Sequence, residues 1–152
     1  MSLPTDIIKE LIETKMVFLE RMKLKALKLE RGYVKLLAPL DGNENHIGSV
    51  YAGALFTLAE IPGGALFYTC FDETRFYPII KQMEIQFLKP AKEDVWVEAS
   101  LSEEEIRRLT LELDEKGKCD FILSGEVKDM SGQIVARSRG VYKIKSLNQA
   151  MV

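Results

Sequence analysis

One carboxylate stands alone in the most apolar stretch of the chain. Glu60 is the only charged side chain between Val50 and Phe71, in a run otherwise made of apolar, small and hydroxyl-bearing residues. Burial disfavours the ionised form of a carboxyl group, so we expect the pKa of Glu60 to lie above the ordinary value of about 4.3. Such a carboxylate suits a general base or a nucleophile that works near neutral pH.

Asn45 and the residues that follow it could bind a carbonyl oxygen or a water molecule. The Asn45 side chain both donates and accepts hydrogen bonds, and can therefore orient either group. If a helix begins near Ser49–Tyr51, the backbone N–H groups of Ala52 and Gly53 are free at its positive end. Gly53 has no Cβ, which would let an oxygen approach the backbone closely. Glu60 would lie roughly 12 Å from Ala52 along such a helix, so one chain does not easily bring both groups to one carbonyl.

Each candidate also has a purely structural explanation, and both explanations remain open at this point. Asn45 could be a turn residue, and Glu60 could reach solvent or pair with a lysine across a subunit interface. Tyr51 favours packing over acid catalysis, because a phenol with a pKa near about 10 is poorly matched to protonating a leaving group. His46, the only histidine, and Cys70 are weaker candidates for a base and a nucleophile.

These groups need a rigid element to position them, and the stretch from Val50 to Phe71 predicts a buried central helix. Its length approaches that of a membrane span, which needs about 20 mostly apolar residues. The segment from Glu60 to Gly64 interrupts it at the centre with a charge, a proline and two glycines. We therefore expect a helix inside a water-soluble domain, bent at Pro62, and no membrane partner.

The rest of the chain predicts one more long helix and a series of strands. Residues 1–23 should form a helix that packs by one face, because apolar residues recur there at helical spacing. That face consists of Ile8, Leu11, Ile12, Phe18, Leu19 and Met22. Alternating patterns predict a broken pair of strands in residues 24–40 and further strands in 79–90, 94–101, 118–127 and 133–145. Residues 71–78 should form a loop, and the last three strands an antiparallel meander.

A second, shorter helix is predicted between the strands at 94–101 and 118–127. Ser102 and Glu105, three residues apart, form a capping pattern, and Gly117 marks the end. A central helix with five or six antiparallel strands defines an α+β domain in which the sheet curls around the helix. The sequence of 152 residues contains no linker, repeat or low-complexity segment, so we expect one domain over 1–152.

The overall composition argues against several classes of function. A formal net charge of -2 and a pI of about 5.6 leave no basic field for nucleic acid or an anionic membrane. Cys70 and Cys119 form no CxxC pair, and with a single histidine they predict no metal site. The first 15 residues carry acids and lysines in place of the apolar core of a signal peptide, so we expect a cytoplasmic protein.

The segment from Asn45 to Glu60, "NHIGSVYAGALFTLAE", resembles a motif of the hot-dog fold thioesterases. It is most similar to the acyl-CoA thioesterases of the phenylacetate-pathway type and their uncharacterised relatives. In that family an asparagine is followed six residues later by His-Gly-Gly, and a carboxylate stands nine residues after the histidine. Here Asn45 and Glu60 occupy the outer positions, and "YAG" at 51–53 replaces the triplet. The sequence thus departs from the family at Tyr51 and Ala52, and also at Ile80, where a hydroxyl-bearing residue is common.

The resemblance implies a hot-dog fold, in which a curved antiparallel sheet wraps around a long central helix. An extra N-terminal helix would occupy 1–23, and the hot-dog core 24–146. The resemblance also implies hydrolysis of an acyl-CoA thioester without a cofactor, by a homodimer or a dimer of dimers. Glu60 of one chain would face Asn45 and the Ala52 amide of the other. The catalytic residues implied are Asn45, Tyr51, Ala52, Gly53 and Glu60.

Other functions remain open within this fold. One is a protein that binds acyl-CoA or a fatty acyl ligand without turning it over, which the departures at Tyr51 and Ala52 favour. Another is a hydratase or dehydratase, which ordinarily needs a catalytic histidine, and the chain offers only His46. The bend at Pro62 could serve packing alone or could open room for an acyl chain beside Glu60.

Basic residues that could contact the phosphates of coenzyme A lie in three places. Arg75 follows the central helix, and Lys89 stands beside Pro90. Period-two spacing puts a further set on one face of the last strand, and a solvated outer face explains the same pattern. That set consists of Arg137, Arg139, Lys143 and Lys145.

Overall fold

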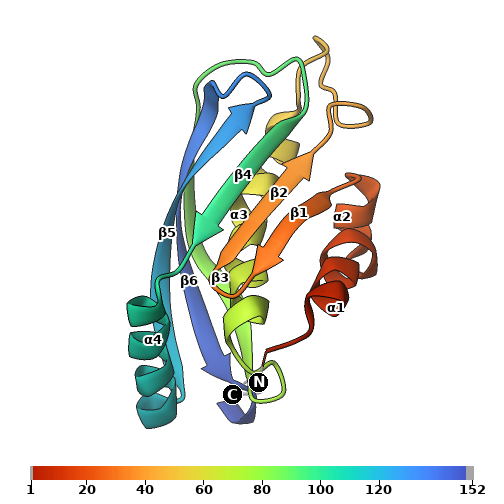
Figure 1. The fold of residues 1–152 in the computed structure, drawn as a ribbon. Coiled ribbons are helices and arrows are strands. Elements are labelled where there is room, and N and C mark those ends of the chain that lie inside the picture. The colour runs from red at the N-terminus through yellow and green to blue at the C-terminus, as the bar shows by residue number, and fades with distance from the viewer. Residues whose placement is uncertain (1, 150–152) are drawn as a thin grey trace.

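A curved six-stranded antiparallel sheet wraps around one long helix, α3 (Figure 1). This is the predicted α+β architecture. The computed structural model describes residues 2–149, so residue 1 and residues 150–152 of the predicted domain lie outside the described part. The elements in chain order are α1 (Thr5–Glu10), the π-turn η1 (Leu11–Lys15), α2 (Val17–Arg21), β1 (Lys25–Glu30), β2 (Tyr33–Ala38), α3 (Ala52–Cys70), β3 (Phe76–Phe87), β4 (Val95–Ser100), α4 (Glu103–Lys116), β5 (Lys118–Asp129), β6 (Ile134–Ser146) and the 3-10 turn η2 (Leu147–Gln149).

The strands follow the order β1-β2-β4-β5-β6-β3 across the sheet. The predicted meander is confirmed, because β4, β5 and β6 are neighbours in that order. β3 leaves the sequence order and pairs with β6, from Phe76 opposite Ser146 to Phe87 opposite Ala136. β1 and β3 are therefore the two edge strands, and the backbone of β3 on its outer side is open to another strand.

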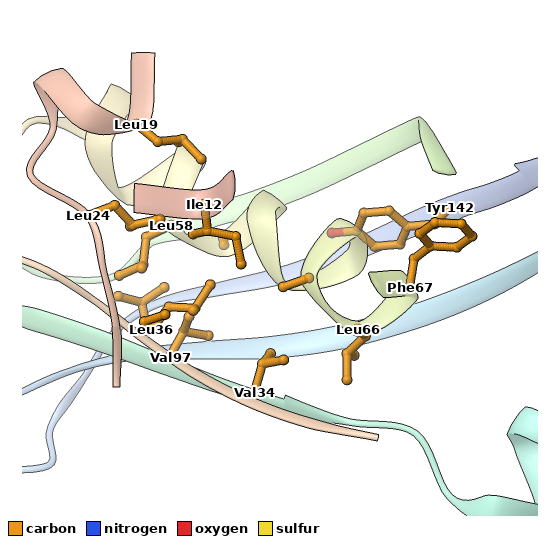
Figure 2. Packing of buried hydrophobic residues seen from close by; sticks show 14 of the residues in the cluster. Ile12, Leu19, Leu24, Val34, Leu36, Leu58, Leu66, Phe67, Val97 and Tyr142 are labelled. Carbon is orange, nitrogen blue, oxygen red and sulfur yellow. The ribbon is translucent and has the colours of Figure 1, made fainter. Parts of the chain in front are cut away.

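The core lies between α3 and the concave face of the sheet. Leu58 and Leu66 of α3 are fully buried and lie over Leu36 and Val34 of β2 (Figure 2). Burying a leucine side chain completely stabilises a fold by roughly 1.5–3 kcal/mol. α3 is therefore held in place mainly by apolar contacts along its length, as the apolar sequence of this helix predicts.

The sheet also contacts α3 closely next to its proline. Pro62 lies inside α3, which continues to Cys70. The ring of Tyr142 from β6 occupies the space that a side chain at Gly63 would need, and stacks on Phe121 at 5.2 Å between ring centroids. The Tyr142 hydroxyl donates a hydrogen bond of 2.8 Å to the backbone carbonyl of Glu60. Gly63 therefore has a clear packing role inside the chain.

The predicted N-terminal helix is confirmed, but it is not one continuous helix. The segment is divided into α1, η1 and α2, with an extended residue, Met16, between η1 and α2. The side chain of Glu13 in η1 accepts a hydrogen bond of 2.8 Å from the N–H of Ala26, on the edge strand β1. This hydrogen bond connects the N-terminal segment to the sheet. The spacing of apolar residues in the sequence does not predict it. Phe18, expected on the buried face, is 62% exposed.

The remaining elements agree with the sequence, with one difference at β3. Ser102 caps α4 by accepting from the N–H of Glu105 at 3.0 Å, and Gly117 ends the helix with a φ of 72°. The backbone carbonyl of Asp72 accepts a hydrogen bond from the N–H of Phe76 and closes a short turn, so β3 begins at Phe76. The loop predicted over 71–78 is therefore too long. Within residues 2–149, no helix combines the length and apolar character that crossing a membrane requires.

Candidate active site

A cavity of about 330 Å³ opens at the start of α3, and we call it the helix-start cavity. Its walls come from the loop before α3, from the first turns of α3 and from the segment after β3. It brings together three of the residues singled out from the sequence, Asn45, Ala52 and Lys89. The lining residues are Asn45, Ile47, Ser49, Val50, Ala52, Leu55, Phe87, Leu88, Lys89 and Pro90.

The start of α3 leaves backbone donors free beside this cavity. Tyr51 is the residue before the helix, and its carbonyl accepts from the N–H groups of Ala54 and Leu55. The N–H groups of Ala52 and Gly53 have no acceptor within the helix, and no side chain of the described residues caps it. Together with the helix dipole, these donors favour a partial negative charge, such as a carbonyl oxygen, at this position.

Gly53 has a packing role in the structure. The exposed ring of Tyr51 folds over the first turn of α3, and a Cβ at Gly53 would lie 2.6 Å from that ring. Glycine is thus needed here because Tyr51 packs against the helix. The Tyr51 ring therefore lies against the first turn of α3 at Gly53.

Asn45 organises the loop that precedes α3. Its side-chain oxygen Oδ1 accepts from the N–H groups of Ile47 and Ser49, each at 3.0 Å. This is the turn role that the sequence left open. Because the oxygen is used in this way, the amide nitrogen Nδ2 is the group with which Asn45 can donate to a ligand in the helix-start cavity.

Ser49 is a site residue that the sequence analysis missed. It is 1% exposed and lines the helix-start cavity, and its hydroxyl has no hydrogen-bond partner among the described residues. Leaving a buried hydroxyl unsatisfied costs roughly 1–3 kcal/mol, so a group that receives this hydrogen would bind favourably. A serine just before a helix usually caps it, but Ser49 stands two positions before Tyr51, too early for that role.

Glu60 lines a separate cavity of about 290 Å³, which we call the Glu60 cavity. Glu60 is its only charged lining residue, and burial raises the pKa of the Glu60 carboxyl, as the sequence predicts. The other walls come from the N-terminal segment, from α3 and from the start of β3. The lining residues are Leu11, Ile12, Met16, Glu60, Ile61, Gly64, Ala65, Tyr68, Tyr77 and Pro78.

The two cavities lie at opposite ends of the edge strand β3. Phe87, the last residue of β3, lines the helix-start cavity, while Tyr77 and Pro78 near its beginning line the Glu60 cavity. The cavities share no lining residue. One chain therefore keeps its carboxylate apart from its free N–H groups, as the helical distance between Ala52 and Glu60 led us to expect.

Other predicted candidates lie outside both cavities. His46 is exposed in the loop and lines neither cavity. Cys70 is buried, and burial raises the pKa of its thiol, which makes it a poor nucleophile. Ile80 lies at an irregularity in the pairing of β3 with β6 and is 36% exposed.

The predicted phosphate contacts are dispersed. Lys89 is at the helix-start cavity, where its ammonium donates to the side chain of Gln133. Arg75 pairs with Asp114 at 3.4 Å, on another part of the surface. The basic residues of β6 lie on the outer face of the sheet, and two of them pair with acidic residues of β5. Arg137 lies 3.5 Å from Glu126, and Lys143 lies 3.4 Å from Asp120. Arg139 on the same face is exposed. Of these residues, the structure brings only Lys89 to a cavity with Asn45 and Ala52.

Comparison with known proteins places the chain in a family. The model of a domain of unknown function, DUF4442, matches residues 5–143, so the chain belongs to this family. A Pseudomonas aeruginosa protein of unknown function, described as a probable thioesterase, is 53% identical, and the match covers 96% of this chain and 98% of that one with a TM-score of 0.91. The fold is the hot-dog fold that the sequence predicted.

More distant structures share this fold. A thioesterase from Haemophilus influenzae is 12% identical, with a TM-score of 0.77 over 100% of this chain and 97% of that one. A mutant thioesterase from Staphylococcus aureus is 22% identical, with a TM-score of 0.69 over 84% of this chain and 98% of that one. The comparison with curated proteins finds no match.

Proposed function

We propose that this chain is an acyl-CoA thioesterase whose active site is shared between two subunits. One observation carries the proposal: the free N–H groups at the start of α3 and the carboxylate of Glu60 lie at opposite ends of the open edge strand β3. The 53% identity to the Pseudomonas aeruginosa protein, described as a probable thioesterase, supports the same activity.

Pairing of two chains through β3 would bring the helix-start cavity of one chain next to the Glu60 cavity of the other. Strands that pair in antiparallel fashion about a two-fold axis put the beginning of one beside the end of the other. The Glu60 cavity of one subunit would then lie beside the helix-start cavity of its partner. Apolar side chains are exposed at both ends of β3, among them Ile79, Ile80, Phe87 and Leu88. A second copy would cover this surface.

The shared site has the groups that thioester hydrolysis needs. The thioester carbonyl oxygen would accept hydrogen bonds from the N–H of Ala52, Nδ2 of Asn45 and the hydroxyl of Ser49. Glu60 of the partner subunit would take a proton from a water molecule as that water attacks the carbonyl carbon. The tetrahedral intermediate would then collapse with cleavage of the carbon–sulfur bond, and protonated Glu60 would return its proton to the departing sulfur. The products are a carboxylic acid and the thiol of coenzyme A, and Glu60 is again a carboxylate. Lys89 would contact a phosphate of coenzyme A at the rim.

A second candidate function is binding of acyl-CoA without turnover. The replacement of the family's histidine by Tyr51 favours it, because the Tyr51 ring packs against the first turn of α3, where the family motif has a histidine. A hydrolysis screen over acyl-CoA esters of different length and polarity, with detection of the free thiol, separates the two functions. Release of thiol from any ester supports the thioesterase, whereas binding by calorimetry with no release from any ester supports the binder.

His46 is expected to be dispensable. It lies outside both cavities, so His46→Gln should keep kcat/KM within about tenfold of wild type, which is roughly 1.4 kcal/mol of barrier. Steady-state kinetics on the best ester of the screen measure this directly. A loss of about a thousandfold would mean that His46 is the base and that the assignment of Glu60 is wrong.

Ser49→Ala is expected to separate stability from activity. The substitution removes a buried hydroxyl that has no partner, so the melting temperature should stay unchanged or rise. Loss of one donor to the thioester oxygen should lower kcat by about tenfold to a hundredfold. Thermal denaturation and turnover are measured on the same preparations. A lower melting temperature with an unchanged kcat would assign Ser49 a structural role alone.

The raised pKa of Glu60 predicts a pH-dependent gain in stability for Glu60→Gln. The native state favours the protonated carboxyl, so the stability that protonation provides is present in acid and is lost as pH rises through the native pKa. Glutamine is uncharged at every pH. The variant should therefore melt at a higher temperature than wild type at neutral pH, and the difference should shrink below the pKa of a free glutamate. Melting temperatures at equal protein concentration test this, and an equal difference at both pH values would contradict it.

A further inference from the structure

Gly64 is a glycine that the packing of its own chain does not explain. Its neighbour Gly63 must be small because the ring of Tyr142 occupies the adjacent space. A Cβ at Gly64, in contrast, would meet no atom within 4 Å. Glycine inside a helix is less favourable than alanine. Because a side chain would fit at Gly64, the glycine must be explained by something other than packing within the chain.

Gly64 lies between two larger residues that face the same cavity. Glu60, Gly64 and Tyr68 are spaced by four residues on α3, so they follow one another on one face of the helix. All three line the Glu60 cavity. The missing side chain at Gly64 leaves open space between Glu60 and Tyr68, and we call this part of the Glu60 cavity the channel.

The interrupted N-terminal segment provides the opposite wall of this channel. Leu11 and Ile12 of η1 and the extended residue Met16 line the Glu60 cavity. The break that separates η1 from α2 thus falls at the cavity. Met16 is 45% exposed, so a change at this position has little effect on the core.

We propose that the Glu60 cavity binds an apolar acyl chain of short to medium length, and that Gly64 and Met16 determine the length it accepts. This inference rests on the proposed thioesterase function. The carbonyl group would lie at Glu60, and the chain would extend over Gly64 toward Tyr68. A volume of about 290 Å³ is at the lower end for ligand cavities, which excludes a fully enclosed long chain.

The test compares chain-length profiles of wild type, Gly64→Leu and Met16→Ala. kcat/KM is measured for acetyl-, hexanoyl-, octanoyl- and palmitoyl-CoA. Leucine is a good helix former, so Gly64→Leu should fold, and its side chain should fill the channel. We expect the ratio of kcat/KM for octanoyl-CoA to that for acetyl-CoA to fall by about tenfold or more. Met16→Ala should shift the profile toward longer chains. Thr110→Leu, on the exposed face of α4, adds the same side chain elsewhere and serves as control.

The other outcomes distinguish this inference from the proposed function. Unchanged profiles in both variants overturn the inference while the thioesterase stands. Light scattering that finds Gly64→Leu monomeric where wild type is dimeric assigns Gly64 to a subunit contact and also overturns it. If wild type hydrolyses no ester, the thioesterase proposal fails, and calorimetric titration with octanoyl-CoA then tests the cavity. Binding that Gly64→Leu weakens by about tenfold supports the acyl cavity, and equal binding by both proteins overturns it.

Discussion

Glu60→Gln is expected to lower kcat for thioester hydrolysis by about a thousandfold while the fold and the binding of acyl-CoA are retained. The amide keeps the shape of the carboxyl group, but it can neither accept a proton from water nor attack a carbonyl carbon. The surroundings of Glu60 are apolar, so the neutral amide costs no more to bury than the carboxylate. Binding and turnover should therefore separate, and calorimetry and a free-thiol assay on the same two proteins measure both quantities.

A matched control is available on the surface. Glu104 is an exposed glutamate of α4, and Glu104→Gln makes the same chemical change far from both cavities, so its kcat should equal that of wild type. Wild-type rates in Glu60→Gln would end the mechanism proposed for this chain. Wild-type protein that binds acyl-CoA, hydrolyses no ester and binds more tightly after Glu60→Gln would identify a non-catalytic binder.

Two inactive variants are expected to restore activity when they are combined in one dimer. Asn45→Asp keeps the side-chain oxygen that accepts from Ile47 and Ser49, but it loses the donor Nδ2 and should be nearly inactive. A heterodimer of Asn45→Asp with Glu60→Gln has one site in which both residues are altered and one in which both are intact. Because a shared site takes one residue from each chain, this heterodimer should have about half of the wild-type kcat.

The heterodimer can be isolated with a different affinity tag on each chain. Each homodimer, purified in the same way, gives the background rate. A heterodimer no more active than the homodimers would place Asn45 and Glu60 in the same subunit's site. A wild-type protein that is monomeric at micromolar concentration by light scattering would remove the shared site altogether.

Much of the fold could be predicted from local patterns. Alternation of apolar residues located the strands, and Ser102 with Gly117 located both ends of α4 because capping depends on neighbouring residues alone. The break at Met16 could not be predicted, since the hydrogen bond from Ala26 to Glu13 joins residues that are 13 positions apart. The pairing of β3 with β6 could not be predicted either, because it joins segments that are far apart in the sequence.

Properties of the candidate site that depend on neighbouring residues in the sequence could be predicted, and properties that depend on the folded geometry could not. The apolar neighbours of Glu60 were enough to predict the direction of its pKa shift. The dual role of Asn45 required the loop geometry, because the same amide can close a turn and donate to a ligand. Ser49 required knowledge of which polar atoms remain unpaired after folding, and Gly53 required the position of the Tyr51 ring.

The contact between Gly63 and Tyr142 makes the substitutions allowed at one position depend on the residue at the other. The Tyr142 ring occupies the space that a side chain at Gly63 would need, and its hydroxyl donates a hydrogen bond to the backbone carbonyl of Glu60. Any side chain gained at Gly63 would push β6 away from α3 and would move the carboxylate with the helix backbone. A homologue could therefore gain a side chain at Gly63 only after Tyr142 had been replaced by a smaller residue. Substitutions at these two positions are expected to occur in a fixed order during divergence, with the strand changing before the helix.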